Sequence, residues 1–435
     1  MVEAELANHI VPMAEILRHR DAAGGLCLSI GEGAGRRKSP GPGVRSSADC
    51  WIDVPRQGAY AVWLRAYWTG GCSNSINLRL DHGHPLTVTD ALFDRWHWVR
   101  GPWLTLSRGC HLLTLTNRED GVLIDQICLA ADRQAPAPGA GQANAVPTVP
   151  ESVAVPPLQA TLSGVANFVE KADPLFGEGA SRTMETVYSA FMLPGREIQV
   201  ELWLRNNAAR ARRVKVQIEA DPRLRFLPRS GLDRTVPANG LAGIALKIAL
   251  AGRTRPVALP VRIRVAPGGE TPTVTVPLVL HLLPRWEKYG PVHGEEVITA
   301  YERHRNALGP GSTKGWRPFD PSRSFDQFGR FDLNAALGRS TYAVAFARMQ
   351  LEAARDAAVD AYISHDDSMA VWVNGKLIYH AEYVGPASDS RSAIRLPLRK
   401  DANHVLVAVG QREHRWHFSF VPAPPPGAGV LLPSE

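Results

Sequence analysis

The amino-acid sequence predicts an all-β protein built from three β-sandwich domains. Short segments in which apolar and polar residues alternate with a period of two recur along the 435 residues, and this pattern is typical of strands with one buried face. The 38 glycines and 34 prolines interrupt these segments, which favours turns over long helices. At about 150 residues per domain, the length suggests three domains.

The first domain is predicted to span residues 1–133. Turn-forming residues separate its strand candidates at the spacing of a sandwich, and these candidates are 51–54, 60–65, 76–80, 109–115 and 118–129. Residues 134–157 consist mostly of alanine, proline and glycine and contain almost no large apolar side chain. We therefore expect an extended linker between the first and second domains.

The second domain is predicted over residues 158–285. The segments 198–204, 214–219 and 261–265 alternate apolar with polar residues, so each strand should have one buried and one exposed face. The pattern resembles the immunoglobulin-like and fibronectin-like spacer domains of multidomain proteins, and we expect that architecture here.

The third domain is predicted over residues 286–422. Asn374-Gly375 lies between two apolar segments and indicates a β-hairpin, because a type I′ turn needs positive φ at both central residues. This stretch resembles galactose-binding-like jelly-roll domains. A short helix is expected at 297–308, and residues 423–435 form a proline-rich tail.

Composition argues against several classes of protein. The formal net charge of +7 comes from scattered arginines, not from a basic block that would follow a nucleic-acid backbone, so we expect no nucleic-acid partner. No apolar stretch approaches the roughly 18 residues of a membrane-spanning helix. The five cysteines lie in the first 130 residues without CxxC spacing; one must stay unpaired within the chain, and one or two disulfides or buried thiols suit the rest.

The two ends of the first domain carry a resemblance to a known family. Val2-Glu3-Ala4-Glu5 opens the domain and 118–129 closes it, and together they resemble the calcium-stabilised β-sandwich carbohydrate-binding modules of the family 6/35 type. The resemblance implies a jelly roll in which a structural Ca²⁺ pins the first strand to the last, with Glu3, Glu5 and Asp125 as ligands.

Charge supports this cation. Glu3 and Glu5 are two residues apart, so in a strand they share a face, and Asp125 can approach from the closing strand. Three converging carboxylates would repel one another without a cation. The alternative is a set of ordinary exposed carboxylates.

The resemblance also implies a glycan among loops at one end of this sandwich. Sugars stack on aromatic rings and bind directed polar groups, and the candidate ligand-binding residues are Trp68, Asn74, Trp96, Trp98, Asn117 and Arg118. For any single tryptophan, packing in the core is the alternative. The net positive charge would suit an acidic polysaccharide or an acidic protein, although solvated surface arginines explain it as well.

No motif indicates catalysis. Asp366 and Asp367 are adjacent, so in a strand they point to opposite faces and cannot together flank a scissile bond. We therefore expect a non-catalytic carbohydrate-binding protein, not an enzyme, that is secreted or at the cell surface after removal of a leader. The alternative is a structural or assembly subunit of a surface filament, layer or large protein complex; a polysaccharide-degrading enzyme is the least favoured reading.

Overall fold

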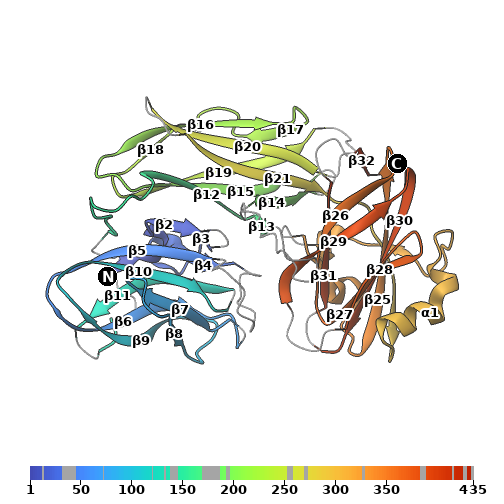
Figure 1. The fold of residues 1–435 in the computed structure, drawn as a ribbon, viewed down its shortest axis with the longest axis horizontal. Helices are drawn as coiled ribbons and strands as arrows, with labels where there is room; N and C mark the ends of the chain where they lie inside the picture. The colour runs from blue at the N-terminus through green and yellow to red at the C-terminus, as the bar shows by residue number, and fades with distance from the viewer. Residues whose placement is uncertain are drawn as a thin grey trace.

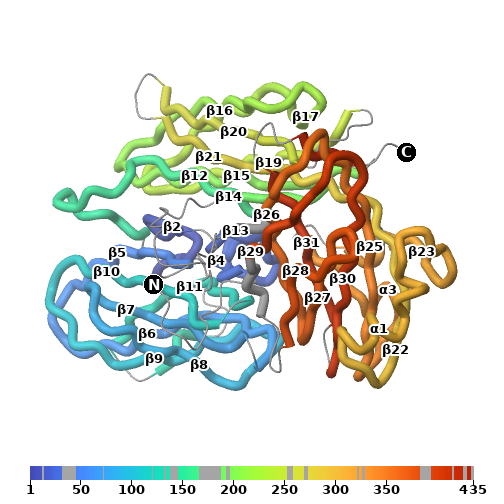
Figure 2. Tube along the Cα trace, turned by 45° about the vertical axis from the view of Figure 1, so that its right-hand side comes forward, coloured from blue at the N-terminus to red at the C-terminus, as the bar shows by residue number. Residues whose placement is uncertain are grey.

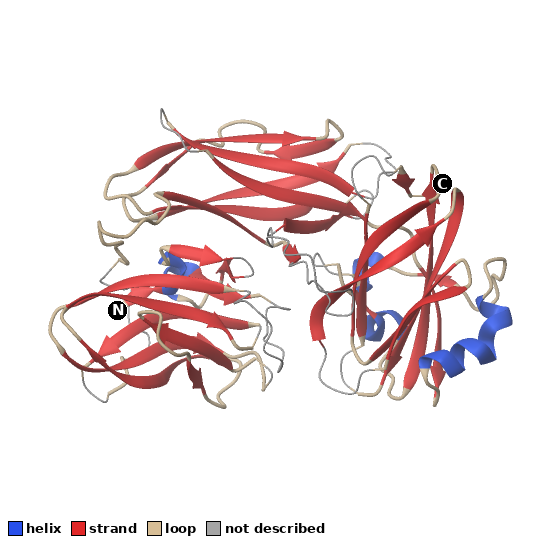
Figure 3. Cartoon of the chain, viewed as in Figure 1, coloured by secondary structure: helices blue, strands red, loops and turns tan. Residues whose placement is uncertain are grey.

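The chain folds into three successive pairs of β-sheets (Figure 1, Figure 3), which confirms the all-β prediction. We call the pairs the N-terminal, middle and C-terminal sandwiches. No helix among the described residues is long and apolar enough to cross a membrane. The computed structural model describes the whole chain except residues 12–13, 32–45, 72, 120, 132–133, 138–145, 169–186, 193–195, 252–257, 269–272, 326–328, 383–387, 414–415, 425–428 and 433–435.

The N-terminal sandwich packs two antiparallel sheets over one apolar core. Its elements are β1 Val2–Glu3, η1 Ala4–Leu6, β2 His9–Val11, β3 Ala14–Arg18, η2 Ala23–Gly25, β4 Leu26–Ile30, β5 Ser47–Val54, β6 Gly58–Tyr67, β7 Ser75–Leu80, β8 Leu86–Thr89, β9 Trp96–Leu106, β10 Gly109–Asn117 and β11 Val122–Ala130. One sheet has the order β3-β4-β11-β6-β9, and the other has β2-β5-β10-β7-β8. The first strand, β1, pairs with the last, β11.

The middle sandwich also has two sheets around one core. Its strands are β12 Leu158–Ser163, β13 Ala166–Phe168, β14 Val187–Met192, β15 Ile198–Asn206, β16 Arg212–Ala220, β17 Leu224–Leu227, β18 Arg234–Val236, β19 Leu241–Leu250, β20 Ala258–Pro267 and β21 Val274–Leu282. The sheet orders are β12-β15-β19-β17 and β13-β14-β21-β20-β16-β18. Strands β14 and β21 pair in parallel.

The C-terminal sandwich carries a helix on one sheet. Its elements are β22 Glu287–His293, α1 Val297–Leu308, β23 Arg317–Pro318, α2 Pro321–Ser324, β24 Phe331–Asp332, α3 Leu333–Leu337, β25 Ala343–Ala353, β26 Ala357–His365, β27 Ser368–Val373, β28 Lys376–Ala381, β29 Ser388–Leu398, β30 Asp401–Gln411, β31 His417–Ala423 and β32 Val430–Leu431. The sheet orders are β23-β22-β25-β30-β27-β28, with β32 on β25, and β24-β31-β26-β29.

Two local predictions in the C-terminal sandwich are confirmed. Helix α1 covers the expected residues 297–308, and the hairpin β27–β28 turns through Asn374 and Gly375 at φ 51° and 78°. Within the predicted proline-rich segment 423–435, Val430–Leu431 pairs with β25. The ranges predicted for the domains stay predictions of how the chain divides.

Arg205 joins the N-terminal and middle sandwiches. Its guanidinium is almost fully buried, and its Nε donates to the carbonyls of Leu6 and Ala7 at 3.1 and 3.2 Å. Its Nη2 donates to the carbonyl of Pro147 at 3.3 Å. Trp203, on the same strand β15, packs into the core of the N-terminal sandwich. The middle sandwich therefore lies over the edge of the N-terminal sandwich that carries β2 and β3, and β6 and β9 lie on the far side (Figure 1).

We expect Arg205→Ala to lower the free energy of unfolding by about 3 kcal/mol, because it removes a buried charge and leaves several carbonyls without their donor. Urea denaturation followed by tryptophan fluorescence measures this change. Arg210→Ala, at an exposed position of the same domain, is the control and should change the free energy of unfolding by less than about 0.5 kcal/mol. Equal effects of the two substitutions would contradict the structural role of Arg205.

Candidate functional site

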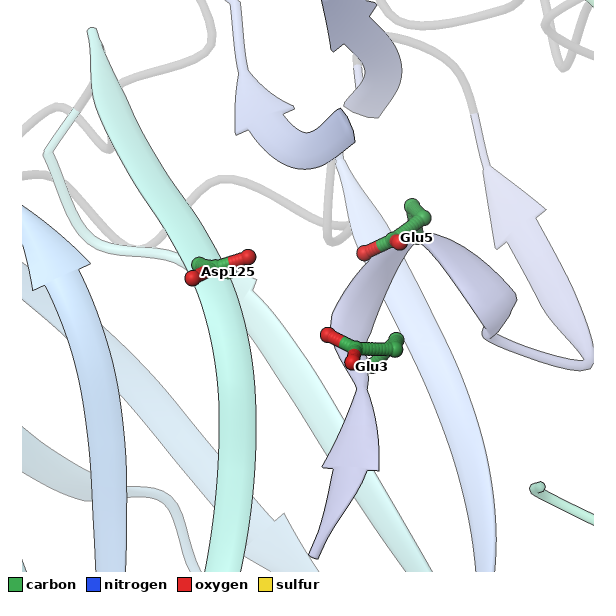
Figure 4. Close-up of side chains that lie close together, drawn as sticks. All are labelled: Glu3, Glu5 and Asp125. Atoms are coloured by element: carbon green, nitrogen blue, oxygen red, sulfur yellow. The ribbon is translucent and has the colours of Figure 1, made fainter. Parts of the chain in front are cut away.

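Three carboxylates meet where the first strand lies against the last. Glu3 ends β1, Glu5 lies in η1 and Asp125 lies in β11, and one oxygen from each lies within 4.8 Å of the others. Figure 4 shows Glu3 and Glu5 on one segment, with Asp125 facing them from β11. All three are buried, at 8%, 5% and 0% exposure, so they are not ordinary exposed carboxylates.

The route by which these residues meet differs from the expectation. A strand running through Glu3 and Glu5 was predicted, but the chain leaves β1 after Glu3 and turns into the 3₁₀ helix η1. The turn, and not the alternation of a strand, brings Glu5 beside Glu3. Asp125 lies where the register of β11 against β6 shifts between Ile124 and Gln126, and such a bulge re-aims a side chain.

Hydrogen bonds hold two members of the cluster in place. The backbone N–H of Ala23 donates to Oδ1 of Asp125 at 3.0 Å, and Arg65 forms an ion pair with the same carboxylate. The side-chain amide of Gln126 donates to Oε1 of Glu3 at 3.1 Å. Asp125 is therefore a fixed point between β6, β11 and η2.

Burial dominates the electrostatics of the cluster. It raises the pKa of Glu5 to about 9, and the neighbouring carboxylates of Glu3 and Asp125 raise that pKa further. Burial also raises the pKa of Asp125, against the opposing effects of the Ala23 N–H and Arg65. Oε2 of Glu5 is buried and accepts no hydrogen bond from the described residues. Without a cation, Glu5 therefore retains its proton at neutral pH.

The donor set fits a hard divalent cation. Ca²⁺ binds oxygen ligands at about 2.3–2.6 Å and prefers carboxylates mixed with carbonyls. Oxygens around one such ion lie up to roughly 5 Å apart, and one oxygen of each carboxylate lies within 4.8 Å of the others. The buried Oε2 of Glu5 supplies a ligand atom that has no other partner among the described residues.

An aromatic and basic face lies beside the carboxylates. On β6, the side chains of Val62, Leu64 and Ala66 belong to the core, so the alternate residues point to the outer face of the sheet. Residues directly opposite each other on paired strands share a face. The register of β6 against β9 therefore gathers Trp63, Arg65, Tyr67, Trp96, Trp98 and Arg100 on this outer face.

Ring contacts organise one end of this face. Tyr67 and Trp96 lie edge to face, with ring centroids 5.6 Å apart, and His19 contacts both rings. The indole N–H of Trp96 donates to Nδ1 of His19 at 3.2 Å. The guanidinium of Arg65, which also pairs with Asp125, lies 5.3 Å from the ring centroid of Trp96. Arg65 thus connects the carboxylate cluster to the aromatic face.

The rest of the face differs in exposure. Trp63 is only 7% exposed, whereas Trp96 and Trp98 are half-buried and Arg100 is exposed. Further along β9, Trp103 is 42% exposed. Half-buried indoles have a fixed orientation and still present part of a ring to solvent, which is the arrangement that stacking on a ligand requires.

Two of the predicted loop residues have structural partners. Trp68 is fully buried and donates its indole N–H to Asp90 at 3.0 Å, and His97 lies 2.9 Å from the same carboxylate. The side-chain amide of Asn74 donates to the carbonyl of Asp90 at 2.6 Å, and the backbone N–H of Asn74 donates to Glu119. Trp68 presents no ring surface to a sugar, so its place is in the core.

The other two polar candidates lie at the same end of the sandwich. Asn117 is 6% exposed at the end of β10, where its backbone N–H donates to the carbonyl of Ser46. The guanidinium of Arg118 bonds to Ser75 and Glu119. The predicted set therefore divides into a loop network and the two indoles Trp96 and Trp98 on the outer face.

The predicted ligand-binding set does not include three residues that lie beside these indoles. Arg65 and Tyr67 lie within an alternating run of β6, and His19 follows β3. The sequence feature that could have identified them is that aromatic and basic residues occupy alternate positions in both Trp63-x-Arg65-x-Tyr67 and Trp96-x-Trp98-x-Arg100. These two runs indicate a shared surface only when the register of β6 against β9 is known, because that register places them side by side.

Comparison with known proteins gives no family. No family model matches the chain, and no curated protein matches its sequence. Among solved structures, an anti-sigma factor domain-containing protein from Clostridium clariflavum is 9% identical, with 97% of this chain and 98% of that chain covered, at a TM-score of 0.28.

Two further solved structures are carbohydrate-active enzymes. A cycloisomaltooligosaccharide glucanotransferase from Paenibacillus sp. is 10% identical, with 93% of this chain and 45% of that chain covered, at a TM-score of 0.24. A family 123 glycoside hydrolase from Clostridium perfringens is 11% identical, with 29% and 27% covered, at a TM-score of 0.21. The chain thus spans less than half of the length of either enzyme.

The raised pKa of Glu5 predicts how pH affects the metal-free protein. The native pKa of about 9 exceeds the ordinary value of 4.5, so the native state retains a proton that the unfolded chain releases. Stability should therefore fall as pH rises from about 5 to 8. Glu5→Gln should remove this dependence of stability on pH. In the presence of chelator at pH 8, the free energy of unfolding of the variant should be higher than that of the wild type by on the order of 2 kcal/mol.

Urea denaturation at both pH values measures the effect. Glu302→Gln, in the exposed face of α1, is the control and should follow the wild type at both pH values. An unchanged slope of stability against pH in Glu5→Gln would show that Glu5 is ionised in the native protein.

Proposed function

We propose that this protein is a non-catalytic carbohydrate-binding protein that holds a glycan on the outer face of the β6–β9 pair. The observation that carries the proposal is the face formed by Trp96, Trp98 and Arg65 beside a buried carboxylate cluster. The proposed glycan site therefore lies on the outer face of a sheet, and not among the loops at the end of the sandwich where it was expected from the sequence.

Ring stacking supplies the main attraction. The faces of pyranose rings are rich in C–H groups, which pack on indole rings with little loss of hydration. Trp96 and Trp98 are two residues apart on one strand, so their side chains lie about 7 Å apart on the same face. Successive parts of one glycan chain can contact both rings.

Charge favours acidic sugars. Arg65 is already paired with Asp125, but Arg100 is exposed on the same face, directly opposite Trp63. A guanidinium at the edge of an aromatic surface can bind a carboxylate with two parallel hydrogen bonds. We therefore include uronate-containing polysaccharides among the ligands.

The same proposal gives the carboxylate cluster a structural Ca²⁺ held by Glu3, Glu5 and Asp125. The ion would take the place of the Glu5 proton, would balance the charge of the three carboxylates and would fasten β1 and η1 to β11. The same proposal includes a secreted or surface location, where calcium concentrations are high enough for a structural ion.

Replacing an indole of the face should weaken glycan binding. We expect Trp96→Ala and Trp98→Ala each to reduce retention on a uronate polysaccharide such as alginate by about tenfold, because each removes a stacking surface. Affinity electrophoresis in gels containing alginate, or a neutral xylan, measures the retention. Arg100→Ala should reduce retention on alginate more than on xylan.

Tyr342→Ala is the matched control, because this aromatic side chain is 61% exposed on the C-terminal sandwich. It should leave retention unchanged. A wild type that no tested polysaccharide retains would argue against glycan binding and favour the assembly-subunit alternative, for which stoichiometric co-purification with a partner is the test.

Calcium should stabilise the protein and displace a proton. We expect Ca²⁺ to raise the melting temperature of the wild type and, at pH 7, to release about one proton per ion because Glu5 must ionise to bind it. Titration calorimetry in two buffers with different ionisation enthalpies counts the protons.

Glu5→Gln should lose the calcium response while staying folded, and Glu302→Gln should retain it. An unaltered calcium response in Glu5→Gln would remove this cluster as the site. Glycan binding that persists in chelator would show that the aromatic face binds glycan without the structural ion. The two proposals can therefore fail independently.

A further inference from the structure

A groove opens along one edge of the middle sandwich. It lies between β16 of one sheet and β17 of the other and has a volume of about 740 Å³. Its lining is mixed: Val216, Ile218, Leu224, Phe226 and Leu232 are apolar, and Gln217, Glu219, Arg225 and Arg229 are polar or charged. The carboxylate cluster and the aromatic face lie in the N-terminal sandwich, so this groove is separate from the proposed glycan site.

Both strands beside the groove have free edges among the described residues. Strand β17 is the last strand of its sheet. Strand β18 pairs only with Arg212, Arg213 and Val214 of β16, so the remainder of β16 has no neighbour on that side. An edge strand with unpaired backbone groups can accept a further strand.

The register of β17 shows which backbone groups face this edge. The N–H of Ala251 donates to the carbonyl of Arg223 at 2.6 Å. Because bonded pairs alternate in an antiparallel ladder, Arg225 and Leu227 bond toward β19, whereas the N–H and carbonyl of Phe226 point to the open edge.

Side chains on β17 alternate in the same way. All three residues 224–226 line the groove; Leu224 and Phe226 lie on the side of β17 that faces the core, and Arg225 lies on the opposite side with an exposed side chain. Arg229, also exposed, lies at the rim, whereas the one acidic lining residue, Glu219, is paired with Arg264 at 3.0 Å. The two arginines therefore give the rim a positive charge.

The charge of the whole domain has the same sign. Residues 158–285 contain 18 Lys and Arg against 10 Asp and Glu, a net charge of +8, while the full chain has +7. The positive charge of the protein is thus concentrated in the middle domain. Such a field attracts and orients acidic partners.

We propose that the groove between β16 and β17 binds an extended segment of a partner protein, which adds to the free edge of β17 and alternates apolar with acidic residues. Main-chain hydrogen bonds to Phe226 would set the register. The apolar side chains of the segment would enter the groove beside Leu224 and Phe226, and its acidic side chains would lie on the outer side near Arg225.

A short synthetic peptide in which valine alternates with glutamate tests the proposal by fluorescence anisotropy. We expect it to bind the full-length protein, and we expect the Arg225→Glu/Arg229→Glu double variant to weaken binding by about tenfold. Hydrogen exchange should show new protection of the Phe226 amide when the peptide is bound. The same peptide N-methylated at alternate residues, so that its edge cannot donate hydrogen bonds, should not bind.

The matched control is Arg196→Glu/Arg210→Glu, which makes the same change in charge at two exposed positions that flank β15 and do not line the groove. Its binding should equal that of the wild type. The proposal is wrong if the glutamate peptide does not bind, if a valine–lysine peptide binds equally well, or if the control variant loses as much affinity as the groove variant.

Discussion

The ion pair between Arg65 and Asp125 connects the parts of the N-terminal sandwich on which the proposed glycan site depends. Asp125 is fully buried at a bulge of β11, so its charge needs a fixed partner. The same guanidinium lies over Trp96. A change in the charge of the carboxylate cluster therefore affects Arg65, the side chain that orients the aromatic face. A cation bound by Asp125 and a glycan stacked on Trp96 would both depend on the position of Arg65.

The junction between sandwiches determines which surfaces stay accessible. Arg205 and Trp203 fasten the middle sandwich to the side of the N-terminal sandwich that carries β2 and β3, and β6 and β9 remain on the far side, as Figure 2 also shows. The groove between β16 and β17 lies on the middle sandwich itself. The aromatic surface that carries Arg65 and Arg100 and the positively charged edge of the middle sandwich are thus separate, so a glycan and a polypeptide could bind at the same time.

Local patterns in the sequence were sufficient for much of the fold. Alternation with a period of two predicted the strands, because a half-buried strand needs apolar residues on one face only. Asn374-Gly375 predicted its hairpin because few other residue pairs adopt positive φ twice in succession. The resemblance of the first domain to calcium-stabilised modules, and not a local pattern, implied that Glu3, Glu5 and Asp125 lie together.

Only the tertiary structure decided which side chains share a surface. Trp68 and Trp96 look equivalent in the sequence, yet one is fully buried and the other lies on the outer face. The register of β6 against β9, and the bulge that turns Asp125 toward Arg65, depend on contacts between residues far apart in the chain. The sequence alone determined the residue types and the strand faces, whereas pairing between distant strands decided their partners, because register is a non-local property.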